Sequence, residues 1–263
     1  MDSTHQTEVA QTRVSGVDRD QPRHAKRQTE TKDRKAAIVV GLLFITATVA
    51  NVLSTSLTSP LVNAPDYLAG LPAHETQVRV GALLALIPAV GSASIAIALY
   101  PVLKRYHAGL ALGAVGFRLI EAVFYVVDII GLLALVTLGQ ALARAGAPGD
   151  SYAQTIGSLI EAGRQWATYV FGVSAFSLGA LMYYAVLYQT RLIPRWLAGW
   201  GIVAVAGSLT AAVGILFGLA PYSLPMIILV LPIAIQEMAL ALWLVAKGFA
   251  APAITTGPAL VSN

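Results

Sequence analysis

Long runs of apolar residues alternate with short polar segments along most of this chain. Six of these runs reach about 20 residues, the length that a helix needs to cross the hydrocarbon core of a bilayer. They cover about residues 36–57, 78–100, 109–138, 166–188, 196–219 and 224–247. None of them alternates with a period of two, as the strands of a membrane barrel do. Backbone polar groups find no partners in hydrocarbon except one another, so the pattern predicts an all-α integral membrane protein with a six-helix transmembrane bundle.

The apolar runs divide the 263 residues into three parts. Residues 1–35 are polar and lack periodicity, which predicts a disordered, charged tail. Residues 36–250 form the predicted six-span transmembrane domain, and residues 251–263 form a short C-terminal tail. The first apolar run begins only at about Ala36 and is not followed by a small-residue cleavage site. We therefore interpret it as a membrane anchor and not as a signal peptide.

Composition agrees with a membrane protein and limits the chemistry. Hydrophobic residues make up 57% of the chain and charged residues only 11%, against about 25% charged residues in an ordinary globular domain. The chain has no Cys, which removes disulfides, thiolate metal sites and cysteine nucleophiles. Its four His residues lie in the tail or in predicted loops, so no imidazole accompanies a serine within an apolar run. We expect no enzyme activity, no cofactor and no bound metal.

Lys and Arg residues are distributed unevenly between the two sides of the predicted bundle. The tail, two connections and the end of the last span carry 13 of the 17, whereas the opposite side carries Arg79, Arg144 and Arg164. Positive charge accumulates in cytoplasmic loops, so we predict that both termini are cytoplasmic. The basic excess beside membrane segments does not indicate nucleic-acid binding; it favours anionic lipid as a partner of the tail. The tail residues expected to attract lipid are Lys26, Arg27, Lys32, Arg34 and Lys35.

Polar residues recur on one helix face of the third apolar run. They are Arg118, Glu121, Tyr125 and Asp128, at intervals of three and four. A charge in the middle of the bilayer costs at least about 2.5–3.5 kcal/mol, so such residues normally face the bundle interior and find partners. Glu237 of the last, antiparallel run lies at nearly the same depth as Arg118, roughly 13 Å from the cytoplasmic end. We hypothesise a buried polar cluster of Arg118, Glu121, Tyr125 and Glu237, with Asp128 nearer the outer interface.

One guanidinium facing two carboxylates leaves a net charge of −1, which is costly in a low dielectric. One carboxylate should therefore hold a proton near neutral pH or bind a cation. Two interpretations of the cluster stay open. It is either the site of a small proton- or cation-linked carrier, or a buried ion pair that fixes helix register. The alternative to a carrier is a non-catalytic membrane partner, sensor or lipid-binding protein. A carrier requires a polar cavity that reaches the cluster from at least one side.

Small and aromatic residues give weaker signals. Gly109 with Gly113 and Gly214 with Gly218 have the G-x-x-x-G spacing, which favours close helix packing within the chain or, alternatively, a homo-oligomer. Several Tyr and Trp residues surround the predicted connection at 189–195. Together with its arginines they indicate an aromatic belt at the membrane interface and not a ligand cage.

Several longer motifs resemble the bacterial domain-of-unknown-function family 4386. They are NAPDYLAG (63–70), LYPVLKR (99–105), LALGAVGFRLIEA (110–122), FSLGALMYY (176–184), QTRLIPRWLAGWG (189–201) and QEMALALWLVAKGF (236–249). The resemblance covers residues 36–250 and implies a multi-span protein of a bacterial cell membrane. It places Arg118, Glu121 and Glu237 within family-like motifs, but it implies no activity, cofactor or catalytic residue.

Overall fold

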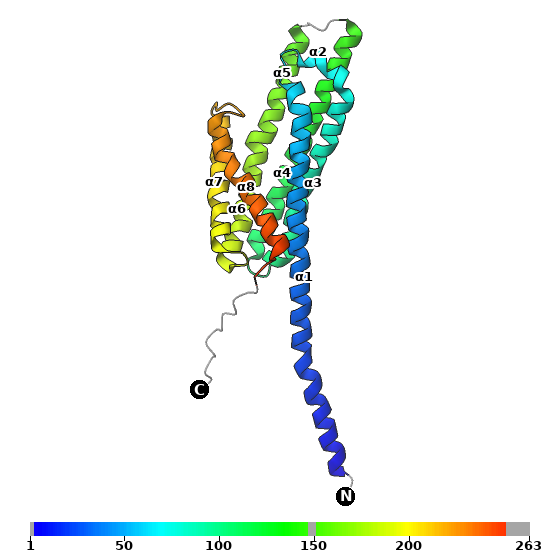
Figure 1. Cartoon of the computed structure of the whole chain (residues 1–263), viewed down its shortest axis with the longest axis vertical. Helices are drawn as coiled ribbons and strands as arrows, with labels where there is room; N and C mark the ends of the chain where they lie inside the picture. Colours follow the sequence, from blue (N-terminus) through cyan, green and yellow to red (C-terminus); the bar gives the residue numbers. More distant parts are fainter. Residues whose placement is uncertain (1–2, 147–150, 251–263) are drawn as a thin grey trace.

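The computed structural model describes the backbone of residues 3–146 and 151–250, and the side chains in these ranges from residue 28 onward (Figure 1). Six helical segments are long and apolar enough to cross a membrane, which confirms the predicted six-helix bundle of a multi-pass membrane protein. The elements are α1 (Ser3–Val62), α2 (Tyr67–Gly70), η1 (Leu71–His74), α3 (Glu75–Leu103), α4 (Ala108–Ala145), α5 (Ser151–Gln165), η2 (Trp166–Gly172), α6 (Val173–Thr190), α7 (Arg195–Leu216) and α8 (Leu224–Ala246). The second span runs through α2, η1 and α3, and the fourth through α5, η2 and α6.

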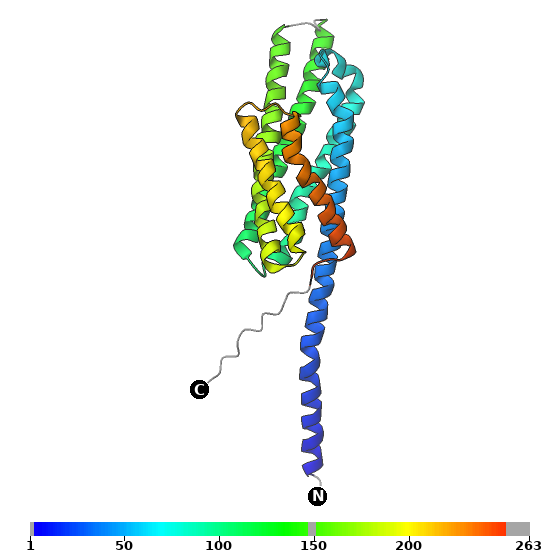
Figure 2. The ribbon, with the colours of Figure 1, turned by 60° about the vertical axis from the view of Figure 1, so that its left-hand side comes forward.

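The first helix is longer than the sequence pattern predicts. We expected residues 1–35 to be disordered, but α1 begins at Ser3 and its N-terminal part projects beyond the bundle (Figures 1 and 2). The prediction is therefore corrected for residues 3–35. The membrane span supplies the costly helical nucleus, so each further residue adds only the small cost of propagation. The predicted C-terminal tail, residues 251–263, lies outside the described residues.

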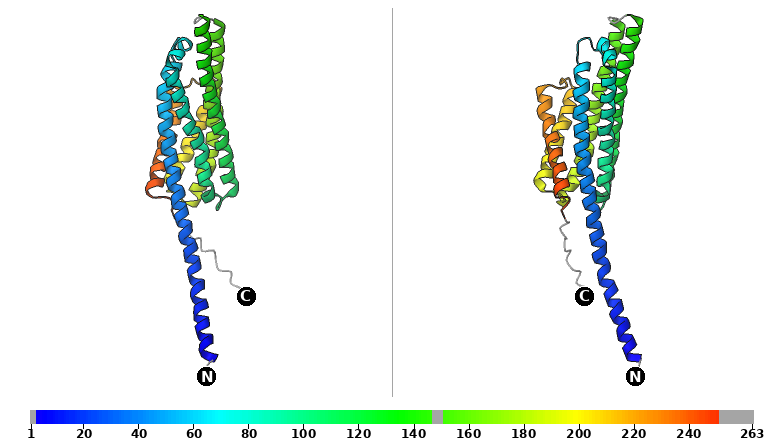
Figure 3. Two further views of the ribbon diagram at one scale, coloured as in Figure 1. Left: turned by 90° about the vertical axis from the view of Figure 1, so that its right-hand side faces the viewer. Right: turned by 45° about the vertical axis from the view of Figure 1, so that its right-hand side comes forward.

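The six spans form a closed ring. α1 packs against α3, α3 against α4, α4 against α6, α6 against α7, and α7 against α8, which returns to α1 (Figure 3). A helix with its side chains is about 10–12 Å across, so helices on opposite sides of such a ring do not touch along their length. The interior of the ring is therefore occupied by side chains and by the cavities that they leave.

The two ends of the ring are packed differently. We call the end where α1 leaves the ring the basic end; the connections 104–107, 191–194 and 247–250 lie there. The opposite, far end carries the connections 63–66 and 217–223. All six spans contribute to the core cluster at the basic end. The far-end cluster comes from α1, α2, η1, α3, α4 and α5 only, because α7 and α8 end nearer the middle of the molecule (Figure 1).

Glycines allow the closest helix contacts, although only part of the predicted spacing is used for this purpose. A methyl group on Gly113 of α4 would lie 2.6 Å from the sulfur of Met182 in α6. Gly218, in contrast, lies beyond the end of α7 with a positive φ of 99°, and it serves the turn toward α8. A close backbone approach between spans involves Gly41 of α1, where an added methyl group would lie 2.7 Å from the carbonyl oxygen of Ala241 in α8.

We expect Gly41→Ala to lower the free energy of unfolding in detergent by about 1–3 kcal/mol, because the methyl group forces α1 away from α8. The matched control is Gly116→Ala in α4, where nothing lies within 4 Å of the added methyl group. This variant should be neutral or raise stability by up to about 1 kcal/mol. Thermal unfolding in one detergent compares the two, and equal stabilities would contradict the close packing of α1 on α8.

Candidate functional site

The four residues of the hypothesised polar cluster line one cavity in the middle of the ring. This central cavity has a volume of about 240 Å³, and every span contributes to its wall. Arg118, Glu121 and Tyr125 come from α4, and Glu237 comes from α8. The helical intervals therefore place the first three on the inner face, and the equal depth of the two antiparallel helices brings the fourth to the same level.

Arg118 and Glu121 form a buried ion pair. Nη1 of Arg118 lies 3.0 Å from Oε2 of Glu121, and the two side chains are only 4% and 2% exposed. Ser92 of α3 donates a hydrogen bond of 2.5 Å from its Oγ to the same carboxylate oxygen. The guanidinium lies over the ring of Phe176, 5.0 Å from its centre. Nε and Nη1 of Arg118 are both buried and make no hydrogen bond with the described residues, so the ion pair leaves these two donors without a hydrogen-bond acceptor.

Glu237 lies in the same cavity but outside the ion pair. Arg118 makes its ion pair with Glu121, and no ion pair joins it to Glu237 among the described residues. Oε1 of Glu237 is buried and has no hydrogen-bond partner among the described residues. Of the two carboxyl groups in the central cavity, that of Glu121 has an ion-pair partner and that of Glu237 has none among the described residues.

A second cavity begins at the far end of the ring and carries its own charged group. This far cavity has a volume of about 370 Å³. Arg164 of α5 joins two carboxylates in its wall: Nε lies 3.1 Å from Oδ1 of Asp128, and Nη1 lies 2.6 Å from Oε2 of Glu161. Asp128, placed near the outer interface by its depth, thus belongs to an ion-pair network inside a cavity. One guanidinium and two carboxylates give this group a formal charge of −1.

A turn of π-helix shapes one wall of the far cavity. In η2 the backbone N–H of Val173 donates to the carbonyl oxygen of Thr168, five residues earlier. The wider turn inserts one residue into the helical register. Thr168, Tyr169 and Val173 all line the far cavity. The hydroxyl of Tyr169 also contacts that of Tyr222 in the connection between α7 and α8, which links the π-helical turn to the chain just before α8.

The two cavities adjoin each other. Five residues line both of them, and these come from α1, α3, α4, α6 and α8: Asn51, Pro88, Tyr125, Val173 and Val230. Polar residues of α1 continue this wall toward the far end, where Thr55, Ser59 and Asn63 line the far cavity. A continuous set of polar side chains therefore leads from the far end to Arg118, Glu121 and Glu237.

Large side chains fill the ring on the other side of the central cavity. The fully buried Leu99, Leu103, Tyr183, Tyr184 and Leu240 belong to the core cluster of the basic end. A buried hydrogen-bond chain adds to this packing: the hydroxyl of Tyr184 donates to Oε1 of Gln236, and Nε2 of Gln236 donates to the carbonyl oxygen of Leu197 over 3.0 Å. Access to the central cavity is therefore asymmetric, with polar cavities toward the far end and packed side chains toward the basic end.

Sequence reasoning missed several residues of this arrangement. Ser92 is not among the residues of the hypothesised cluster, yet its hydroxyl donates a hydrogen bond to the carboxylate of Glu121. Arg164 and Glu161 precede the predicted fourth span, which starts in the structure at Ser151. The spacing of three residues between them on an amphipathic helix is the sequence feature that could have predicted their ion pair. Within the part of the chain that the structure describes, no group of three or more His, Asp or Glu side chains could hold a metal ion.

Comparison with known proteins identifies a family. The family described as a domain of unknown function (DUF4386) matches residues 39–248. This match confirms the resemblance drawn from the motifs. No protein of curated function and no solved structure matches the chain. The match covers all six spans in whole or in part, together with both cavities.

Proposed function

The chain belongs to the DUF4386 family, and because this membership supplies no activity, we propose from the site alone that the protein is a small carrier for protons or small cations. The observation that supports the proposal is the polar route through two adjoining cavities to the unpartnered carboxyl group of Glu237. A carrier needs access to a midplane site from one side at a time. One-sided access of this kind is supported by the cavities toward the far end and by the packed side chains toward the basic end.

Charge favours a cation or a proton over an anion. The Arg118–Glu121 pair is neutral, so an ionised Glu237 gives the central cavity a formal charge of −1. The far cavity has the same formal charge from Arg164, Asp128 and Glu161. Fixed negative charge in a region of low dielectric lowers the free energy of a bound cation and raises that of an anion. Glu237 is then the group that takes up the proton or the cation.

The distribution of Lys and Arg gives the carrier a direction in the membrane. We propose that the basic end faces the cytoplasm and that the protein lies in the cell membrane of a bacterium. The cavities then open toward the outside. In this arrangement the proton or cation enters through the far cavity, passes Tyr125 and reaches Glu237. Release to the cytoplasm requires the packed side chains around Tyr184 and Gln236 to separate.

Flux into liposomes tests the proposal. Purified protein in vesicles with an imposed pH, sodium or potassium gradient should dissipate one of these gradients faster than empty vesicles. Glu237→Gln keeps the shape of the side chain but removes the titrating group, so we expect it to lower the flux at least about a hundredfold, the lower end of what a single proton-transferring residue typically supplies. The matched control is Glu75→Gln, which removes a carboxylate at the far end that pairs with Arg79 and lines neither cavity. It should keep the wild-type flux.

Two outcomes would overturn the proposal. A flux that is the same in wild type, Glu237→Gln and Glu75→Gln would mean that the ions do not pass through the central cavity. The absence of flux for every gradient would favour the alternative, a non-catalytic membrane partner or sensor, with the Arg118–Glu121 pair as a fastener of helix register.

A further inference from the structure

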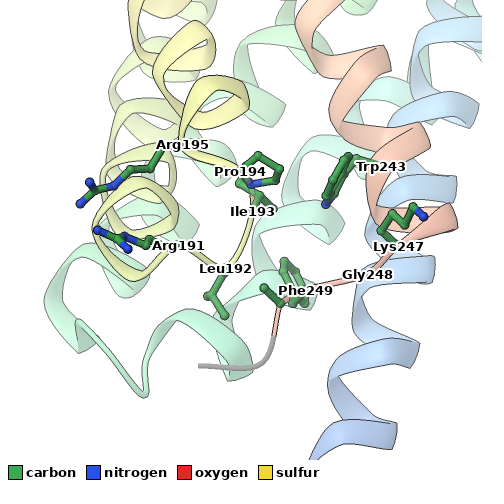
Figure 4. A pocket seen from close by; sticks show the side chains of 10 residues that line it. Arg191, Leu192, Ile193, Pro194, Arg195, Trp243, Lys247, Gly248 and Phe249 are labelled. Carbon is green, nitrogen blue, oxygen red and sulfur yellow. The ribbon is translucent and has the colours of Figure 1, made fainter. Parts of the chain in front are cut away.

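A third cavity lies at the basic end, away from the proposed route. It has a volume of about 570 Å³ and is formed by the connection between α6 and α7, the end of α8 and the residues that follow α8 (Figure 4). We call it the basic-end pocket. Its lining residues are Arg191, Leu192, Ile193, Pro194, Arg195, Trp243, Lys247, Gly248, Phe249 and Ala250. Three of them are cations, and none is acidic.

These cations lack the carboxylate partners that most other arginines of the bundle have. Arg79, Arg105, Arg118 and Arg164 each form an ion pair with Asp or Glu. Arg191, Arg195 and Lys247 form none with any described residue. The Arg195 guanidinium instead lies over the ring of Tyr188, 5.4 Å from its centre. The basic-end pocket therefore carries three positive charges that the protein does not neutralise.

The walls of the pocket are held in place by contacts that do not use these charges. Leu192 and Ile193 are buried in the core, and the backbone N–H of Ala250 donates to the carbonyl oxygen of Leu192 over 2.8 Å. Arg34 of α1 donates to the last carbonyl oxygens of α8, at 2.9 Å to Leu244 and 2.7 Å to Val245. Arg34, one of the basic residues of the predicted tail, thus fastens the end of α8. The pocket is thus a built part of the fold.

The pocket combines apolar side chains in its middle with cations on two sides. Figure 4 shows the Trp243 ring beside Pro194, with Phe249 below them. Arg191 and Arg195 project together from the α6–α7 connection on the side away from Trp243, and Lys247 lies on the other side of Trp243, at the end of α8. The pocket lies where α7 begins and α8 ends, which is the level of the membrane interface. Basic pockets between spans at this level suit anionic head groups, and the N-terminus of α7 adds a favourable dipole.

We infer that the basic-end pocket binds the head group of an anionic phospholipid. The phosphate lies against Arg191 and Arg195, and the glycerol and the start of an acyl chain cover Trp243, Pro194 and Phe249. Lys247 adds a positive charge on the side of α8. The site is independent of the carrier proposal, because none of its residues lines the central or the far cavity.

Arg191 offers a variant that separates binding from folding. It ends α6 in the left-handed region, with φ 58° and ψ 26°, where Asn is tolerated better than Arg. Arg191→Asn therefore removes the charge while it suits the backbone, so its thermal stability should equal or exceed that of wild type. Arg195→Gln and Lys247→Gln complete the set. The matched control is Lys104→Gln, which removes an exposed cation at the same end that does not line the pocket.

The test measures lipid retention by native mass spectrometry after purification in mixed micelles that contain phosphatidylglycerol and phosphatidylcholine, and separately after addition of inorganic phosphate. We expect wild type to retain phosphatidylglycerol over phosphatidylcholine. Each pocket variant should weaken retention about fivefold and the triple variant about a hundredfold, with Lys104→Gln unchanged. Inorganic phosphate that displaces the lipid at low millimolar concentration would assign the site to a free phosphate instead. If Lys104→Gln lost as much phosphatidylglycerol as the pocket variants, general surface charge would explain the retention, and the proposed site would be wrong.

Discussion

Replacing Arg118 by Met is expected to lower the free energy of unfolding in detergent by about 3–5 kcal/mol. The substitution leaves the carboxylate of Glu121 buried at 2% exposure, with the hydroxyls of Ser92 and Tyr125 as hydrogen-bond donors but without its cation. An unpaired buried charge costs far more than the ion pair contributes when it is intact. Urea or thermal unfolding, followed by the circular dichroism of the helices, measures the loss.

A double variant shows whether the loss comes from the broken pair. In Arg118→Met with Glu121→Gln, the charge is removed together with its partner, and the Gln side chain still accepts the hydrogen bond from Ser92. We expect this double variant to recover most of the stability, as replacement of a whole buried ion pair by neutral groups often does. Equal stability of the single variant and wild type would contradict the buried pair.

The same double variant also decides between the structural and the functional interpretation of the cluster. A folded double variant that carries wild-type flux would make the ion pair a fastener of α4 register with no part in transport. A folded double variant without flux would place the pair in the transport site beside Glu237. Stability and flux are measured on the same preparation, so loss of folding cannot be mistaken for loss of function.

The sequence predicts the fold better than it predicts the ends of its elements. Six apolar runs without period-two alternation are enough to specify six spans, because a helix is then the arrangement that pairs the backbone polar groups of each run in hydrocarbon. Composition says little about where a helix stops in water. The polar residues 3–35 and the amphipathic residues 151–165 therefore prolong the first and fourth spans beyond the predicted limits.

Helical periodicity and depth in the membrane predict which residues share the site, but not all of the contacts between them. The spacing of three residues gives the pairing of Arg118 with Glu121, and equal depth brings Glu237 to the same level. Neither of them says which neighbour Glu237 contacts, because the lateral position depends on how α8 closes the ring against α1. The far cavity could not be predicted from the sequence. It exists because α7 and α8 end early and because η2 is wound as a π-helix, and no residue pattern in the chain predicts either feature.

Water in the far cavity should make the α1 residues that face it react with polar thiol reagents. The chain has no Cys of its own, so each introduced thiol is the only one present. Thr55 lines the far cavity, whereas Leu53, on the same helix, is 50% exposed and lines none of the four cavities of the bundle described in the structure. The thiolate is the reacting form, and it does not persist in hydrocarbon. We expect a charged methanethiosulfonate to modify Thr55→Cys on the order of a hundredfold faster than Leu53→Cys.

The charge and the side of addition sharpen this measurement. The formal charge of −1 from Arg164, Asp128 and Glu161 should make a cationic reagent react faster at Thr55→Cys than an anionic one of similar size, and added salt should reduce the difference. With the basic end in the cytoplasm, the reagent acts when it is added to intact cells and not when it is added to inside-out vesicles. Equal rates for Thr55→Cys and Leu53→Cys would show that lipid, and not water, fills the far cavity. The polar route to Glu237 would then have no aqueous entrance.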